Sequence, residues 1–226
     1  MNRFLNPALI IVGIGSGLIG NYSSSTPDTS KLLPPGFAFA IWGVIYLTGL
    51  YLAYKLLRQE ISLPGNGIFL ISLGYFLSGL WIRFDGHAGI VAILAVLTLV
   101  ANISAIKTLK NTEISRLLLN LLATFAGWIT VATSLVIADA FKISTASDQK
   151  VAIYLAVSLC IACILYLSLV PVIGYIATIA WATFSLLFSK STLGAPGFWV
   201  SAVAFALTMA LLIAGLAKMR SARLNA

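Results

Sequence analysis

The stretch PPGFAFAIWGVIYLTGLYLAYK, residues Pro34 to Lys55, decides the fold class. Its two prolines mark the start of a helix, because proline is tolerated in a first helical turn but not in a helix interior. The apolar run that follows is long enough to cross the hydrocarbon core of a bilayer, which takes about 20 residues. Phe39, Trp42 and Tyr46 recur at steps of three and four, so they share one helical face. The stretch predicts a transmembrane helix with an aromatic face.

The whole chain has the same apolar character. Of its 226 residues, 60% are hydrophobic and 9% are charged, and the mean hydropathy is +1.03, whereas soluble domains carry about 25% charged residues. We predict an all-α, polytopic transmembrane helix bundle forming one integral membrane domain. The net charge of +8 lies almost entirely between the apolar runs. Membrane lipids are therefore the expected partner of these charges, and nucleic acid is not.

Eight apolar runs predict about eight spans. The sixth and seventh runs, residues 151–169 and 172–189, are nearly continuous, and only Pro171 and Gly174 offer a turn between them. We predict a tight hairpin there, while a kinked or re-entrant arrangement stays open. The first run follows Arg3 and could be a signal peptide, but NYSSSTPDTS after it lacks a cleavage pattern. The predicted spans are approximately residues 6–22, 36–57, 67–83, 88–106, 116–138, 151–169, 172–189 and 197–217.

The first span carries glycines that favour close helix packing. Gly13 and Gly17 are spaced to let a second helix approach closely, which suits an inner helix and also allows a homodimer through this face.

The lysines and arginines predict the orientation of the chain. Cations accumulate on the cytoplasmic side of membrane proteins. With eight crossings, one side holds Arg3, Lys55, Arg58, Lys107, Lys110, Arg116, Lys218, Arg220 and Arg223, and the other holds Lys31, Arg83, Lys142, Lys150 and Lys190. Both termini are therefore expected in the cytoplasm, and the expected location is a bacterial inner membrane.

Residues that would carry enzyme chemistry are sparse. His87 is the only histidine and falls in a connection, and Asp139 falls at the end of a span, where a solvated side chain is the simpler interpretation. Cys160 and Cys163 share one helical face, but two cysteines cannot build a four-ligand zinc site. We therefore predict no catalytic residues, no metal site and no enzyme activity.

Tryptophans give the remaining signal. Trp81 and Trp199 lie near span ends, as interfacial anchors do, whereas Trp42, Trp128 and Trp181 lie deeper. A deep indole beside small residues fits a ligand cavity as well as a packed seam between helices. The pattern leaves both interpretations open.

The proline pair with its aromatic residues resembles the signature of the tryptophan-rich sensory protein and translocator protein (TspO/MBR) family. In that family a proline pair precedes a second helix carrying phenylalanine, tryptophan and tyrosine, here Pro34, Pro35, Phe39, Trp42 and Tyr46. SGLWIRF around Trp81 and FAGWITVA, with Phe125, Trp128 and Ala132, are similar more weakly, and Ser78 stands where the family has asparagine. The resemblance covers about residues 5 to 140.

The resemblance implies a division of the chain and a function. It implies a five-helix region at residues 1–140, with residues 141–226 forming three additional transmembrane helices packed on it. It further implies a pocket for a tetrapyrrole or sterol-like lipid under the loop from Ser23 to Pro35, with no required cofactor and a porphyrin or heme-like molecule as the ligand. The implied ligand-binding residues are Pro34, Pro35, Phe39, Trp42, Tyr46, Ser78, Trp81, Phe125, Trp128 and Ala132.

Three functions are consistent with these observations. The leading one is a membrane-embedded binding or sensory protein for an apolar, planar small molecule. The second is a facilitator or transporter of small hydrophobic metabolites, for which the last three spans supply a second half. The third is a structural membrane protein whose tryptophans only pack against one another.

Overall fold

The structure of the protein is a computed structural model that describes residues 4–20, 32, 34–61, 63–84, 87–112, 114–168 and 172–224. Within these residues the chain forms eight α-helices and three short 3-10 helices, with no strand. The elements are α1 (Leu5–Gly20), η1 (Gly36–Ala40), α2 (Ile41–Leu57), α3 (Gly65–Trp81), η2 (Ile82–Phe84), α4 (Ala88–Leu109), α5 (Arg116–Ala140), α6 (Asp148–Ser168), α7 (Ile173–Leu186), η3 (Leu187–Ser189) and α8 (Lys190–Leu224).

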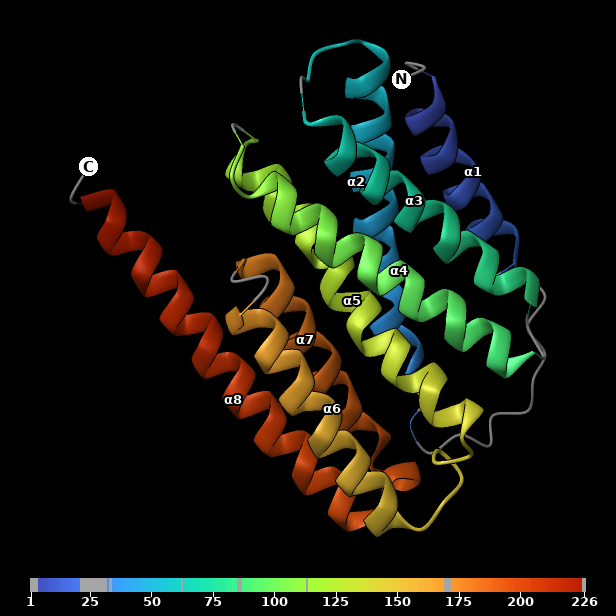
Figure 1. Ribbon diagram of the computed structural model, residues 1–226. Helices are drawn as coiled ribbons and strands as arrows, with labels where there is room; N and C mark the ends of the chain where they lie inside the picture. Colours follow the sequence, from blue (N-terminus) through green and yellow to red (C-terminus); the bar gives the residue numbers. More distant parts are fainter. Residues whose placement is uncertain are drawn as a thin grey trace.

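The first five helices close into a ring. Going around it, α1 packs against α3, α3 against α4, α4 against α5, α5 against α2, and α2 against α1 (Figure 1). The seam between α2 and α5 is the least extensive of these five contacts. This seam is the one that carries the aromatic face of α2.

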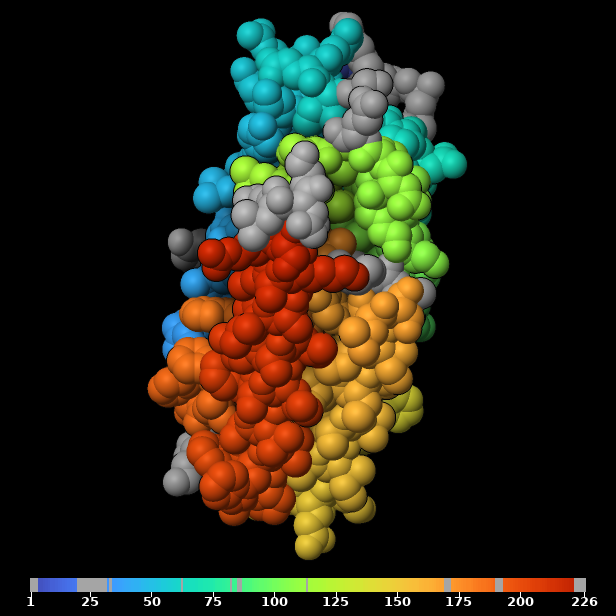
Figure 2. Space-filling view, turned by 90° about the vertical axis from the view of Figure 1, so that its left-hand side faces the viewer, coloured from blue at the N-terminus to red at the C-terminus, as the bar shows by residue number. Residues whose placement is uncertain are grey.

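The last four helices form a second ring that shares α5 with the first. In it α5 packs against α7, α7 against α8, α8 against α6, and α6 more loosely against α5. Helices α6 and α8 lie side by side on the outside of the molecule (Figure 2). Trp181 of α7 also donates its indole N–H to the carbonyl oxygen of Ala38 in η1, at 3.0 Å. The two rings therefore share a helix and are joined by a hydrogen bond.

Glycines set the closest helix crossings. A Cβ atom at Gly13 of α1 would overlap the carbonyl of Tyr75 in α3, and one at Gly79 of α3 would overlap the carbonyl of Gly13. The crossing of α5 and α7 is built the same way, because Gly127 lies against Tyr175 and Gly174 lies against Asn120. Without side chains at these points the backbones come close enough for dispersion contacts along the crossing.

The prediction of helices from hydropathy is confirmed. Each predicted span coincides with a helix, and residues 151–189 form the separate helices α6 and α7, which supports the hairpin over one kinked helix. The last helix extends at both ends of the predicted 197–217 and contains a kink at Gly194, whose φ of 68° favours glycine. Pro171 and most of the loop from Ser23 to Pro35 lie outside the described residues.

Helix lengths vary across the bundle. Five helical segments are long and apolar enough to cross a membrane: 36–57, 88–109, 116–140, 148–168 and 193–221. Three are shorter, namely 5–19, 65–81 and 173–189. Helix direction alternates along the chain, so the start of α1 and the end of α8 both lie toward the top of Figure 1, at the same end of the bundle. An even number of membrane crossings places the two ends of the chain on the same side.

The crossing of α1 and α3 predicts unequal effects of two nearby substitutions. Gly13→Ala places a methyl group against the Tyr75 carbonyl, whereas Gly15→Ala places one in open space on the same helix. We expect Gly13→Ala to lower the stability of the protein by roughly 1–3 kcal/mol, as overpacking does, and Gly15→Ala to leave it unchanged or slightly raised. Thermal unfolding in detergent compares them. Equal unfolding midpoints for the two variants would contradict the close contact between Gly13 and the Tyr75 carbonyl.

Candidate functional site

Five of the ten predicted site residues form one aromatic cluster at the seam between α2 and α5. The ring of Trp42 lies 5.2 Å from that of Tyr46, 6.2 Å from that of Phe125 and 6.4 Å from that of Trp128, measured between centroids. Phe39, in η1, lies edge-on to Trp128 at 5.8 Å. The rings contact one another, and they occupy the seam as a packed group. We call these five residues the aromatic cluster.

The cluster is buried on its α5 side and open on its α2 side. Phe125 and Trp128 are fully or almost fully buried, Trp42 is partly buried, and Phe39 is 40% exposed. The start of α2 therefore covers the indole of Trp128 with side chains that themselves face the outside of the bundle. A molecule entering from the lipid would meet Phe39 and Trp42 first.

Trp128 carries an unsatisfied hydrogen-bond donor. Its Nε1 is buried and has no hydrogen-bond partner among the described residues. The indole N–H of Trp81 is donated to Thr98 Oγ1 at 3.2 Å, and that of Trp181 to the Ala38 carbonyl. A buried donor without an acceptor costs roughly 1–3 kcal/mol. The N–H of Trp128 is therefore a buried donor for which the described residues supply no acceptor.

The other predicted site residues lie apart from the cluster or at its edge. Pro34 is buried and Pro35 is the N-cap of η1, with extended backbone. Ser78 donates its hydroxyl to the Tyr75 carbonyl in its own helix, and Trp81 is buried between α3 and α4. Ala132 is partly buried one turn beyond Trp128. The structure thus brings Phe39, Trp42, Tyr46, Phe125 and Trp128 together, and it turns Ser78 and Trp81 to a different helix pair.

Tyr75 is a central residue that sequence reasoning missed. It is completely buried, its ring lies 4.5 Å from that of Phe125, and its hydroxyl donates to the Ile45 carbonyl at 2.8 Å. Gly49 makes room for the ring, because a Cβ there would lie 2.7 Å from it. Helix α3 is apolar on all faces, so no periodic pattern singles out this tyrosine. The sequence feature that could have pointed to Tyr75 is Gly49, on the neighbouring helix α2.

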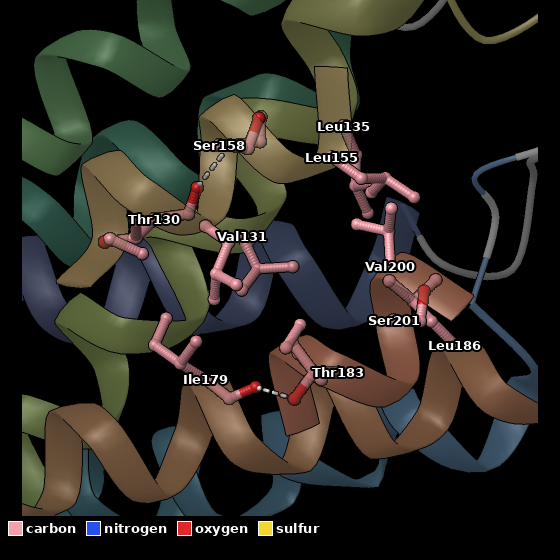
Figure 3. Close-up of a pocket in the computed structure, with 15 residues that line it drawn as sticks. Thr130, Val131, Leu135, Leu155, Ser158, Ile179, Thr183, Leu186, Val200 and Ser201 are labelled. Atoms are coloured by element: carbon pink, nitrogen blue, oxygen red, sulfur yellow. Dashed lines mark hydrogen bonds between the residues drawn. The ribbon is translucent and has the colours of Figure 1, made fainter. Parts of the chain in front are cut away.

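The second ring has a small, partly open cavity of its own. The cavity has a volume of about 60 Å³ and lies between α5, α6, α7 and α8 (Figure 3). Thr130, Ser134, Thr183 and Ser201 line it, and each donates its hydroxyl to a carbonyl of its own helix. A space of this size holds only a few water molecules. The aromatic cluster does not line this cavity.

A comparison with models of protein families shows which family the chain belongs to. A family model described as TSPO-like protein matches residues 5–217. The chain belongs to the TspO/MBR family. The match runs through α8, so the last three helices lie within the region that the family model describes. None of the curated proteins matches the chain, and none of the solved structures does.

Membership of the TspO/MBR family, together with the long apolar helices, makes this an integral membrane protein. The family indicates ligand binding or transport within the membrane, and its members are in general not enzymes. No group of three or more histidine, cysteine or acidic residues that could hold a metal ion occurs in the part of the chain that was placed. His87 and Asp139 are exposed at helix ends, and Cys160 and Cys163 are free thiols.

The unsatisfied indole predicts how two tryptophans differ when each is replaced by phenylalanine. Both changes shrink the ring, but Trp181→Phe also removes the hydrogen bond to Ala38, whereas Trp128→Phe removes a donor that has no partner. We expect Trp128→Phe to cost less stability by roughly 0.5–1.5 kcal/mol, the value of one hydrogen bond. Thermal unfolding of the purified, ligand-free variants measures the difference. A larger loss for Trp128→Phe would show that its N–H is already bonded.

Proposed function

We propose that this protein is a binding or sensory protein that holds an apolar, planar small molecule at the aromatic cluster and does not act as an enzyme. The observation that carries the proposal is the buried, unsatisfied N–H of Trp128 beneath the partly exposed rings of Phe39 and Trp42. A tetrapyrrole or a sterol-like lipid supplies both things this site lacks, a flat apolar body to stack on the rings and an oxygen atom to accept the N–H.

Entry of such a ligand requires the seam to open. The rings of the cluster contact one another, so a ligand has to displace Phe39 and Trp42 from Trp128. Two features favour this opening: α2 and α5 share the least extensive contact of the first ring, and Phe39 sits in the short η1 helix and not in α2 itself. Aromatic side chains have few rotatable bonds, so they lose little entropy when they settle against the ligand.

The proposed orientation places both termini in the cytoplasm of a bacterium, with the protein in the inner membrane. The helix ends near the start of α1 carry Lys55, Arg58, Lys107, Lys110, Arg116, Lys218 and Arg220, whereas Arg83, Lys142 and Lys150 lie at the opposite end. This excess follows the rule that cations stay on the cytoplasmic side.

Binding of a porphyrin tests the proposal directly. We expect protoporphyrin to quench the tryptophan fluorescence of the purified full-length protein in a saturable way. Trp42→Ala should weaken binding about tenfold or more, which corresponds to about 1.4 kcal/mol, because it removes one of the stacked rings. Trp199→Ala is the matched control, since that indole is 66% exposed and lies on α8. Equal affinities of the two variants would refute a site at the aromatic cluster.

Transport is a second candidate, and one feature of the second ring favours it. Tyr166 and Tyr175 stack with centroids 6.4 Å apart and planes 8° from parallel. The hydroxyl of Tyr175 lies 2.9 Å from that of Thr130, which lines the cavity, while Tyr166 lines a cleft at the end of the bundle. The stacked pair thus links a residue of the cavity to a residue of the cleft, which is where a gate between the two would lie.

Flux measurements decide between binding and transport. If the tyrosine pair is a gate, Tyr166→Ala should raise the rate at which a small hydrophobic fluorophore crosses the membrane of liposomes holding the protein. Tyr51→Ala, which changes an exposed tyrosine of α2, is the control. Flux at the level of empty liposomes for wild type and both variants would eliminate transport of this probe and leave the binding function.

A further inference from the structure

The cleft at the end of the second ring has the size of a ligand site. Its volume is about 630 Å³, within the range of roughly 300–1,000 Å³ usual for small-molecule pockets. The start of α5 forms one wall, the end of α8 forms the other, and the ends of α6 and α7 that face each other form the floor. The lining residues are Arg116, Leu119, Asn120, Tyr166, Leu167, Val172, Ile173, Leu211, Ala214, Gly215, Lys218 and Met219.

Unequal helix lengths create this cleft. Helix α8 has 35 residues and α5 has 25, but α6 has 21 and α7 only 14. Because a helix rises 1.5 Å per residue, the short pair ends while α8 and α5 continue past it. Figure 1 shows the end of α8 and the start of α5 projecting beyond the ends of α6 and α7 that meet there. The space between the two projecting helices is left without a helix to fill it.

Close contacts between helices lie beneath the cleft. Asn120 accepts a hydrogen bond from the backbone N–H of Gly174 at 3.0 Å and donates one to the Arg116 carbonyl at 2.8 Å. On the other side a Cβ atom at Gly215 would lie 3.1 Å from the hydroxyl oxygen of Tyr166. The hydrogen bond of Asn120 thus joins α5 to the start of α7 beneath the cleft, and Gly215 allows α8 to lie close to Tyr166 of α6.

Two cations of the lining have no acidic partner among the described residues. Arg116 and Lys218 are exposed on opposite walls, and no carboxylate lies among the twelve lining residues. No ion pair of either cation occurs among the residues that the structure describes. At the end of α2 the situation differs, because Lys55 and Arg58 contact Glu60 and the hydrogen bond from Lys55 lowers the pKa of the Glu60 carboxyl. The cleft therefore presents two positive charges that no carboxylate of its lining compensates.

We propose that this cleft binds one anionic phospholipid, with the phosphate held between Arg116 and Lys218 and an acyl chain lying along the apolar floor and walls. A soluble anion would use only the two cations, whereas nine of the twelve lining residues are apolar, aromatic or glycine. The cleft also continues onto lipid-facing surface, since Leu167 on its floor is 62% exposed. Asn120, which also lines the cleft, keeps one amide hydrogen that the Arg116 carbonyl does not use.

Lipid retention by the intact protein tests this site. Full-length protein purified from micelles containing equal amounts of phosphatidylglycerol and phosphatidylcholine is examined by native mass spectrometry. We expect one retained phosphatidylglycerol per chain, favoured about tenfold or more over phosphatidylcholine. Arg116→Gln together with Lys218→Gln should abolish this preference. Lys142→Gln with Lys150→Gln removes the same charge at the opposite end of the bundle and should keep it.

A further variant and a competition experiment distinguish lipid bound in the cleft from lipid bound elsewhere on the protein. Ala214→Trp fills the apolar part of the cleft without changing its charge and should also remove the retained lipid. Retention that survives Ala214→Trp, or that falls equally in the Lys142 and Lys150 control, would overturn the proposal. Displacement of the lipid by millimolar inorganic phosphate would overturn it too, because a free anion would then suffice. Arg116, Lys218 and Ala214 are all exposed, and thermal unfolding verifies that each variant remains folded.

Discussion

Two reciprocal glycine crossings hold this membrane protein together. At each crossing a glycine of one helix lies against the backbone of its partner and the partner returns a glycine: Gly13 and Gly79 join α1 to α3, and Gly127 and Gly174 join α5 to α7. In a bilayer the lipid is as apolar as the helices, so hydrophobic burial does little to bring helices together. Close backbone approach supplies the attraction instead. One crossing lies in each ring, so each ring has its own fixed point.

Helix α5 belongs to both rings and connects the aromatic cluster of the first to the cavity of the second. Phe125 and Trp128 point into the first ring, while Thr130, two residues on, lines the cavity of the second and contacts Tyr175. Gly127, directly before Trp128, keeps α7 tight against α5. A ligand that moves α2 away from Trp128 therefore acts on the one helix that both rings share. The bond from Trp181 to Ala38 adds a second link, between α7 and the segment that carries Phe39.

Much of the fold follows from the sequence, because in a bilayer the backbone must satisfy its own hydrogen bonds and a long apolar run therefore becomes a helix. The same logic located the hairpin between α6 and α7. The sequence also grouped Phe39, Trp42 and Tyr46 correctly, since they follow the helical period. It did not identify Tyr75, because α3 is apolar on every face, and it did not separate Trp81 from the cluster. The cleft could not be predicted from the sequence, because it depends on how far four helices of different length extend past one another.

The indole of Trp128 is the feature hardest to explain by packing alone. Three buried side-chain atoms of the described residues have no hydrogen-bond partner, and two of them are amide oxygens, of Asn6 and Asn102. The third is the Trp128 N–H, a group with a single hydrogen that water cannot reach. Trp81 and Trp181 show that this fold supplies acceptors to buried indoles. Phenylalanine would bring an aromatic ring to the same seam without leaving a donor unsatisfied. With no acceptor among the described residues, the Trp128 N–H carries a desolvation cost that the bonded indoles of Trp81 and Trp181 do not.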